Sequence, residues 1–316
     1  MTSQVTTENK STLKQVLKKV PGLVALKRSI WNLLNLDGKR GRSKLDLMAS
    51  FPLYQPCSLG TYNSKAQLTI QTINQLIPAL WSLMESFGFK RPKTQVLDEL
   101  LSSEAEKRNA ADFKVLLDKY QSDKATTHNY YILYSDILKS RSEVKRVFEI
   151  GLGTNNINVV SNMGPGGKPG ASLRAFRDFL ENAEIFGADI DKRVLFSEER
   201  IKTYWIDQTD KNSFQQLNHS IPNDFDLMID DGLHSPNANL HSLEFFLPKL
   251  RIGGWAIIED IGVAAQPLWE IVGAALPSKT IHFIASYLDK NSHVYLAQSA
   301  TIHRVQRNTT KEFLAC

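Results

Sequence analysis

The sequence predicts an α/β fold in which a doubly wound, mostly parallel sheet ends in an antiparallel hairpin and follows a helical N-terminal region. Two patterns predict this fold. From Arg146 onward, short apolar runs alternate with amphipathic segments of helix length, which is typical of parallel strands joined by crossover helices. Near the end, Thr280–Leu288 and His293–Ser299 form two successive strand-like runs, and residues 289–292 form a hairpin-type connection between them.

The N-terminal third is predicted to be helical and to comprise two parts. Residues 1–45 form a basic arm that begins with a polar stretch of the kind that stays disordered. Residues 46–120 form a helical accessory region, because apolar residues recur at helical spacing over 64–88 and over 96–120. We assign residues 121–316 to the α/β domain, since the first clear strand pattern comes only after residue 145.

The α/β domain should contain five strands before the hairpin, which makes a seven-stranded sheet. The predicted strands are Arg146–Gly151, Ala183–Asp189, Ile201–Ile206, Phe225–Asp230 and Trp255–Asp260. The predicted helices are Ser172–Glu181, Arg193–Glu199, Asn237–Leu250 and Gln266–Leu276.

The composition favours a cytoplasmic protein. With 316 residues, of which 42% are hydrophobic, the chain can bury a full core. Its two cysteines, Cys57 and Cys316, indicate neither a disulfide framework nor a zinc site, which fits a reducing compartment. No apolar run approaches the roughly 20 residues that span a bilayer. The N-terminus also lacks a signal-peptide pattern.

The net charge of +5 is concentrated in the N-terminal arm. Residues 1–45 contain ten Lys and Arg against two acids, whereas the remaining chain has a net charge of −3. Because a nucleic-acid-binding enzyme would carry its positive patch around the active cleft, this distribution disfavours a nucleic-acid partner. Apolar residues recur at helical spacing between Leu13 and Leu34, with an interruption at Pro21-Gly22. This segment could pack on its own domain or on a partner subunit, or it could lie on an anionic membrane surface.

The first strand runs into a glycine turn that indicates a ligand site. The sequence from Val147 to Gly153, VFEIGLG, places Glu149, Gly151 and Gly153 where the backbone can approach a ligand closely. A dinucleotide fingerprint would require a third glycine at fixed spacing. Here a long loop follows instead and includes the glycine-rich stretch Gly164–Gly170, which suggests a lid or a wall of the substrate site.

Acidic residues also end the next two strands. Asp189 ends the second strand, and Asp207-Gln208 follow the third. A carboxylate can accept hydrogen bonds from the two hydroxyls of a ribose, while an acid and an amide together can bind an adenine edge. Each acid taken alone could equally be a helix cap or a solvated turn residue.

Two further acidic pairs end the fourth and fifth strands. The first belongs to DDGLH over residues 230–234, and the second is Glu259-Asp260. Because one helix-length segment separates the two strands, they should be neighbours, and their carboxyl ends should meet at one edge of the sheet. Asp231, His234, Glu259 and Asp260 would then lie together. Such a cluster suggests a divalent cation beside a general base.

The strand–glycine turn with its successive acids resembles the class I S-adenosylmethionine (SAM)-dependent methyltransferases. The acidic pairs and the segment SDKATTHNYY, residues 122–131, are similar to the metal-dependent O-methyltransferases that act on the sugars of macrolide antibiotics. This resemblance covers residues 120–262. Residues 1–110 have no counterpart in it, and the long glycine-rich loop departs from the usual short first turn.

The resemblance implies a role for each candidate site residue. It assigns SAM binding to Glu149, Gly151, Gly153, Asp189, Asp207, Gln208 and Asp230, the metal to Asp231, Glu259 and Asp260, and the general base to His234. The chemistry agrees, because hard oxygen ligands favour Mg²⁺ or a similar cation. Metal coordination also makes a sugar hydroxyl a better nucleophile. Asp230 could instead cap the following helix.

The resulting expectation is a SAM-dependent, metal-assisted O-methyltransferase acting on a sugar hydroxyl of a glycosylated natural product or a surface glycan. We expect a cytoplasmic homo-oligomer with possible peripheral membrane contact through its arm. Three alternatives stay open: a metal-independent SAM methyltransferase, an NAD-dependent oxidoreductase, and a non-catalytic scaffold with a methyltransferase fold. Metal chelation would test the metal-independent methyltransferase. A comparison of SAM binding with NAD binding would test the oxidoreductase. Failure to bind any adenosyl ligand would support the scaffold.

Overall fold

The computed structural model describes residues 62–91, 94–276, 279–284 and 292–298. The chain divides into two compact units, residues 1–79 and 80–316. Helix α4 (Tyr62–Ser86) begins in the first unit and ends in the second, and it contains Pro78. The predicted arm over residues 1–45 lies outside the described residues, and the predicted division into three domains stays a prediction.

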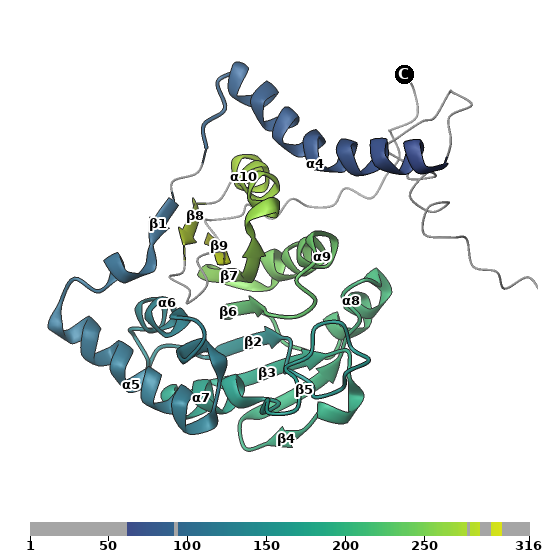
Figure 1. Ribbon diagram of the computed structural model, residues 1–316. Helices are drawn as coiled ribbons and strands as arrows, with labels where there is room; N and C mark the ends of the chain where they lie inside the picture. The colour runs from purple at the N-terminus through teal and green to yellow at the C-terminus, as the bar shows by residue number, and fades with distance from the viewer. Residues whose placement is uncertain (1–61, 92–93, 277–278, 285–291, 299–316) are drawn as a thin grey trace, which may run out of the picture. The chain divides into compact units, whose positions relative to one another are not determined.

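The second unit contains a sheet of nine described strands with the order β1-β8-β9-β7-β6-β2-β3-β5-β4 (Figure 1). The strands are β1 (Thr94–Val96), β2 (Arg146–Ile150), β3 (Glu184–Asp189), β4 (Ser197–Glu198), β5 (Ile201–Trp205), β6 (Phe225–Asp230), β7 (Leu250–Gly262), β8 (Lys279–Ile284) and β9 (Ser292–Gln298). Pairing is parallel from β5 through β7, whereas β9 is antiparallel to both β7 and β8.

This topology confirms the predicted α/β class with its mostly parallel sheet and its antiparallel ending. The strand count is nine instead of seven, because β1 and β4 extend the two edges of the sheet. Part of the predicted hairpin connection, residues 289–291, lies outside the described residues.

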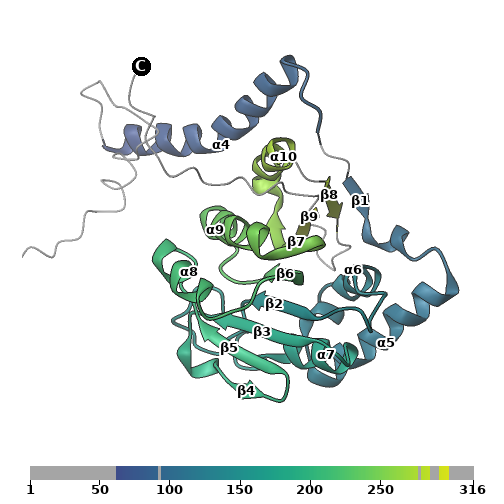
Figure 2. The same cartoon turned by 180° about the vertical axis from the view of Figure 1, so that it is seen from behind.

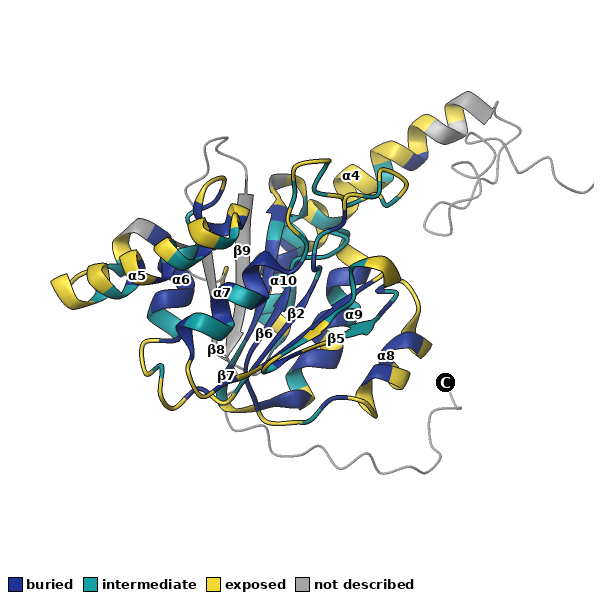
Figure 3. Ribbon diagram, turned by 90° about the horizontal axis from the view of Figure 1, so that it is seen from below, coloured by how far each residue is buried: buried dark blue, intermediate teal, exposed yellow. Residues whose placement is uncertain are grey.

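Helices cover both faces of the sheet (Figure 2). On one face, α5 (Glu104–Tyr120), α6 (Tyr130–Ile137) and α7 (Ala171–Phe179) share a core with Val147 of β2. On the other face, α8 (Lys211–Asn218), α9 (Pro236–Phe246) and α10 (Gln266–Ala275) share a core with the adjacent Phe148. Successive residues of a strand point to opposite faces, so β2 is apolar on both sides. Figure 3 accordingly shows the central strands in the colour of buried residues.

Short 3₁₀ segments complete the second unit, and one of them carries a site residue. They are η1 (Leu97–Leu100), η2 (Asp123–Ala125), η3 (Lys192–Val194), η4 (Leu247–Lys249) and η5 (Val263–Ala265). Because η2 directly precedes α6, it is held against the sheet edge by the core that α6 enters.

The predicted helix over Arg193–Glu199 is wrong, since this segment forms η3 and then strand β4. The hydroxyl of Thr203 explains the extended backbone: it accepts from the Phe196 amide at 2.6 Å and donates to the Phe196 carbonyl at 2.5 Å. The spacing of apolar residues in the sequence cannot reveal such hydrogen bonds between a side chain and the backbone of another segment. Helix α8 and strand β1 were not predicted either.

The strand ends meet as the sequence predicted. Strand β6 pairs in parallel with β7, and Asp230 lies opposite Ile258. The residues that follow, Asp231 on one strand and Glu259-Asp260 on the other, therefore reach the same edge of the sheet.

Candidate active site

One pocket lies at the carboxyl ends of the central strands. Its lining includes the predicted site residues Gly151, Gly153, Asp189, Asp207, Gln208, Asp231, His234 and Asp260. The other three predicted residues, Glu149, Asp230 and Glu259, are buried and do not line it. The pocket also receives Lys124 from η2 and Met163 from the loop after β2.

The glycine turn after β2 brings backbone segments into close contact. Gly151 has a φ of 95°, and a Cβ built on it would lie 2.0 Å from the carbonyl oxygen of Asp231. Only glycine therefore allows the ends of β2 and β6 to approach this closely. Gly153, with a φ of 79°, would place a Cβ 1.8 Å from the sulfur of Met163. The turn thus places backbone without side chains in the wall of the pocket.

Asp189 is fixed by the backbone at the end of β3. One carboxylate oxygen accepts from the Leu152 amide and the other from the Asp191 amide, both at 2.8 Å. Burial raises the pKa of Asp189 despite these hydrogen bonds. Because a carboxylate oxygen can accept more than one hydrogen bond, both oxygens can still receive a ligand hydroxyl.

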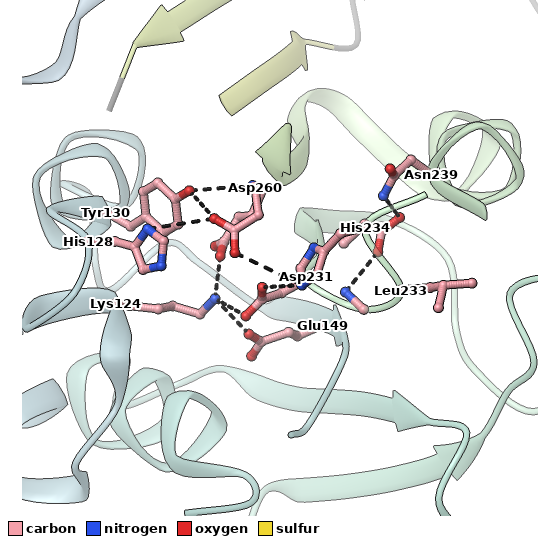
Figure 4. A network of polar contacts seen from close by, with 12 residues as sticks. Lys124, His128, Tyr130, Glu149, Asp231, Leu233, His234, Asn239 and Asp260 are labelled. Carbon is pink, nitrogen blue, oxygen red and sulfur yellow. Dashed lines mark hydrogen bonds and ion pairs between the residues drawn. The ribbon is translucent and has the colours of Figure 1, made fainter. Parts of the chain in front are cut away.

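Gln208 and Asp230 form hydrogen bonds that hold the loop after β6. The amide nitrogen of Gln208 donates to Asp230 at 2.8 Å and to Ser242 at 2.9 Å, while its oxygen accepts from the Leu233 amide at 2.8 Å. Asp230 also accepts from Asn239 at 2.9 Å, and burial raises the pKa of this aspartate. Both residues thereby support the DDGLH turn that carries Asp231 and His234. Figure 4 shows Asp231 and His234 of this turn.

Asp231, His234 and Asp260 form the one candidate metal-binding group among the residues that the structure describes, with ligand atoms that all lie within 4.8 Å of one another. His234 Nε2 is 3.9 Å from an oxygen of each aspartate. His234 and Asp260 adopt positive φ angles of 54° and 52°. Backbone strain of this kind concentrates at functional sites.

Glu259 is not part of this group. Its carboxylate accepts from Lys124 Nζ at 2.6 Å and from the hydroxyl of Tyr134, and it is only 1% exposed. Asp260 is adjacent in the sequence but has a positive φ, and the pairing of β7 with β9 shifts register here, so the two carboxylates contact different residues. In this structure the predicted ligand is therefore part of a buried ion-pair network.

Lys124 is the centre of that network (Figure 4). Its ammonium lies 2.6 Å from Glu259, 2.7 Å from Asp231 and 3.2 Å from Glu149. Glu149 also accepts from the hydroxyl of Ser172 at 2.6 Å. Burial is the main cause that raises the pKa of Glu149 to about 7, and the adjacent Lys124 opposes it.

Asp260 receives support from the segment that follows η2. The hydroxyl of Tyr130 donates to Asp260 at 2.6 Å, and His128 Nδ1 lies 3.6 Å from the same carboxylate oxygen. The His128 ring stacks on Tyr130 at a centroid distance of 4.5 Å. Two residues of the SDKATTHNYY segment thus position one carboxylate of the candidate metal site.

Several of these residues have no pattern that sequence reasoning could use. Lys124 and Tyr130 belong to the quoted segment 122–131, so the resemblance placed them near the site without giving their partners. Tyr134 and Ser172 read as ordinary helix residues in the sequence. Their partners, Glu259 and Glu149, are distant in the chain, and only the fold brings them together.

The comparisons with known proteins point to one kind of enzyme. No family model matches the chain. A demethylmacrocin O-methyltransferase from Streptomyces fradiae is 30% identical over 158 residues, which is 49% of this chain and 38% of that protein. A mycinamicin VI 2''-O-methyltransferase from Micromonospora griseorubida is 33% identical over 128 residues, covering 40% of this chain and 30% of that protein.

A solved relative is a methyltransferase from the mycinamycin biosynthetic pathway in complex with Mg and SAH. It is 29% identical, with coverage of 47% of this chain and 39% of that chain and a TM-score of 0.41. A rhamnosyl tetracenomycin-C 2'-O-methyltransferase from Streptomyces olivaceus is 27% identical over 54% of this chain and 43% of its own length. The chain thus matches well under two thirds of the length of these relatives. The resemblance predicted from the sequence is confirmed: over about half its length, this chain is similar to sugar O-methyltransferases of the SAM-dependent class.

Proposed function

We propose that this protein is a SAM-dependent, divalent-metal-assisted O-methyltransferase acting on a sugar hydroxyl of a glycosylated natural product or a surface glycan. One observation carries the proposal. The glycine turn and Asp189 line the same pocket as Asp231, His234 and Asp260. A cofactor and an activated acceptor can therefore meet within a single cavity. The named relatives, which methylate sugars of natural products, support the acceptor class.

The first half of the pocket would bind SAM, which supplies the methyl group as a sulfonium. The turn at Gly151 and Gly153 would let the backbone contact the cofactor, and Asp189 would accept from the ribose hydroxyls. Asp207 would contact the adenine. Asp230 and the Gln208 side chain would act through the residues that they hold, because their polar atoms are engaged within the protein. Glu149 would act through Ser172 and Lys124, which its carboxylate contacts.

The second half would bind a divalent cation and the acceptor hydroxyl. The donors fit, since two carboxylates provide hard oxygen ligands. A bound cation would lower the pKa of the hydroxyl and orient it. His234 would accept the hydroxyl proton at Nε2, and the oxygen would then form its bond to the methyl carbon as the carbon–sulfur bond breaks. Glu259 would reach the cation only after leaving Lys124 or Tyr134.

Methyl transfer from isotopically labelled SAM tests this proposal. Demethylmacrocin and mycinamicin VI are suitable probe acceptors, with lipid-linked glycans as a second set. We expect product that disappears in excess EDTA and returns with Mg²⁺, while Asp231→Asn abolishes the metal response. Turnover that survives both EDTA and His234→Ala would contradict the mechanism.

A metal-independent SAM methyltransferase is the second candidate, and Lys124 favours it. The ammonium already pairs with Asp231 and Glu259, so these acids have a counter-charge without any metal. In this case the acids would bind polar groups of the acceptor, and chelation would leave the rate unchanged.

We also propose a cytoplasmic homo-oligomer that contacts membranes through residues 1–45. The support is the local charge of this arm and its helical apolar spacing. Among the described residues, no helix is long and apolar enough to cross a membrane. Sedimentation with and without anionic vesicles would test both parts of this proposal.

A further inference from the structure

A buried lysine lies between three acids of the candidate site. Lys124 is 1% exposed, and its ammonium is within 3.2 Å of Glu259, Asp231 and Glu149. An ammonium carries three donors and no acceptor. Lys124 donates to Asp231 and Glu259 and forms an ion pair with Glu149, so these three acids already share a positive charge without a metal.

Asp231 connects this network with the candidate metal site. Its Oδ2 accepts from Lys124 at 2.7 Å, whereas its Oδ1 faces His234 Nε2 at 3.9 Å. One carboxylate thus has one oxygen on the ammonium and the other in the group where a cation would bind (Figure 4). Glu259, the predicted third ligand, is likewise occupied by Lys124.

A divalent cation bound to Asp231 would therefore lie a few ångströms from a fixed positive charge. Repulsion between like charges is strong at such distances, and low solvent exposure increases it. The Lys124 side chain is buried and its ammonium pairs with three carboxylates, so it would have to give up ion pairs in order to move away from the cation. Any cation that enters must share carboxylates with Lys124 and bind against its charge.

We propose that Lys124 is a resident counter-cation of the metal site, which stabilises its acids in the metal-free protein and weakens the binding of the divalent cation. This role rests on the proposed metal-assisted function. In this role Lys124 is a positioning residue, which acts through the acids that it pairs with. Its charge keeps the enzyme folded without metal and makes the cation readily exchangeable.

Calorimetric titration of the purified chain with Mg²⁺ and Mn²⁺ tests the proposal. We expect Lys124→Met to bind the cation at least tenfold more tightly than the wild type. In EDTA the same variant should melt at a lower temperature than the wild type, and saturating Mg²⁺ should restore more of its stability than it adds to the wild type. The variant Lys124→Arg keeps the positive charge at this position, so its affinity should stay near that of the wild type.

Three results would overturn the proposal: unchanged or weaker binding by Lys124→Met, an equal tightening in Lys124→Arg, or a Lys124→Met protein that fails to fold even with saturating Mg²⁺. Cation binding by the wild type and by Asp231→Asn distinguishes a failure of this proposal from a failure of the proposed function. If the wild type binds the cation through Asp231 but Lys124→Met binds no more tightly, only the counter-cation role fails. If neither the wild type nor Lys124→Met binds a cation, the metal-assisted function itself fails.

Discussion

His234 combines a proposed chemical role with an unfavourable backbone conformation. Its φ of 54° lies in the left-handed region, which a residue with a Cβ seldom adopts. Asp260, which shares the candidate metal group, has the same feature at 52°. The network of Gln208, Asp230 and Asn239 holds the turn in place. At the residue scale, the chain thus adopts a less stable backbone conformation at His234 and Asp260, whose side chains face the pocket.

His234→Gly should therefore increase stability while it removes activity. Glycine adopts positive φ without a Cβ clash, so we expect the free energy of unfolding to rise by about 0.5–1 kcal/mol. Turnover should fall by about 10²- to 10⁴-fold, which is typical of losing a general base. Urea unfolding and methyl-transfer assays measure the two effects. His234→Ala is the matched control, which should lose activity without becoming more stable.

Glu149 predicts a pH dependence of stability. Its pKa is raised to about 7 in the folded protein, chiefly by burial, from an unfolded value of 4.5. A raised carboxyl pKa contributes stability that is fully present below pH 4.5 and is lost as pH rises through about 7. The shift corresponds to a loss on the order of 3 kcal/mol. We expect Glu149→Gln to flatten the decline of unfolding free energy between pH 5 and 8.

Urea unfolding at several pH values checks this expectation. Other buried acids such as Asp230 shift in the same direction, so only the difference between wild type and Glu149→Gln is informative. The exposed Glu181 provides a control, and Glu181→Gln should keep the wild-type slope. Parallel slopes for the wild type and Glu149→Gln would show that Glu149 does not titrate as described.

The sequence predicted which residues gather at this edge better than it predicted their partners. Asp231, His234 and Asp260 follow two adjacent strands, and parallel topology brings such ends together. Glu259 follows the same rule by sequence, yet its carboxylate pairs with Lys124 and lies outside the metal group, next to an irregularity of β7 at Asp260. Pattern reasoning identifies a strand end but cannot say which face a terminal residue selects when both faces hold polar groups.

At the scale of elements, the turn after β2 couples two strands through backbone contact. Gly151 and Gly164 both have positive φ, at 95° and 69°. A Cβ at Gly151 would overlap the Asp231 carbonyl, whereas nothing lies within 4 Å of one at Gly164. Both positions therefore require a positive φ, but only Gly151 lies too close to other atoms for a Cβ to fit.

Gly151→Ala should thus be far more damaging than Gly164→Ala. We expect Gly164→Ala to cost about 1 kcal/mol of unfolding free energy, from backbone strain alone. Gly151→Ala should cost roughly 3 kcal/mol or more, because the ends of β2 and β6 must separate. SAM affinity, measured by calorimetry, should fall only in Gly151→Ala. Equal losses at both positions would show that the close approach of β2 to β6 is unimportant.

Elements with strong periodicity were predictable, and those defined by tertiary contacts were not. The strands that became β2, β3 and β6 are mostly apolar and almost fully buried, as expected for strands covered on both faces. Strand β4 is only two residues long and depends on pairing with β5. Strand β1 depends likewise on its pairing with β8. Such short edge strands have no periodic signal, because a neighbouring strand supplies their structure.

At the scale of the whole α/β unit, the sheet separates two tasks along its carboxyl edge. Strands β2, β3 and β5 lead to the proposed cofactor residues, and β6 and β7 lead to the proposed metal residues. The two sets meet where Gly151 touches the backbone of Asp231, where Gln208 bonds to Asp230 and Leu233, and where Lys124 pairs with both Glu149 and Asp231. None of these contacts needs a cation, so the cofactor residues should keep their positions without metal.

Chelation should therefore stop methyl transfer without preventing cofactor binding. In excess EDTA we expect SAM affinity, measured by calorimetry, to stay within about threefold of its value with Mg²⁺, since Gly151, Gly153 and Asp189 need no metal to keep their positions. Turnover should fall to background in the same samples and recover with Mg²⁺. Asp231→Asn should reproduce the EDTA result in the presence of Mg²⁺, whereas Asp189→Asn should weaken SAM binding and leave Mg²⁺ affinity unchanged. A large loss of SAM affinity on chelation would mean instead that the metal organises the cofactor site, and that the two halves of the sheet edge act as one.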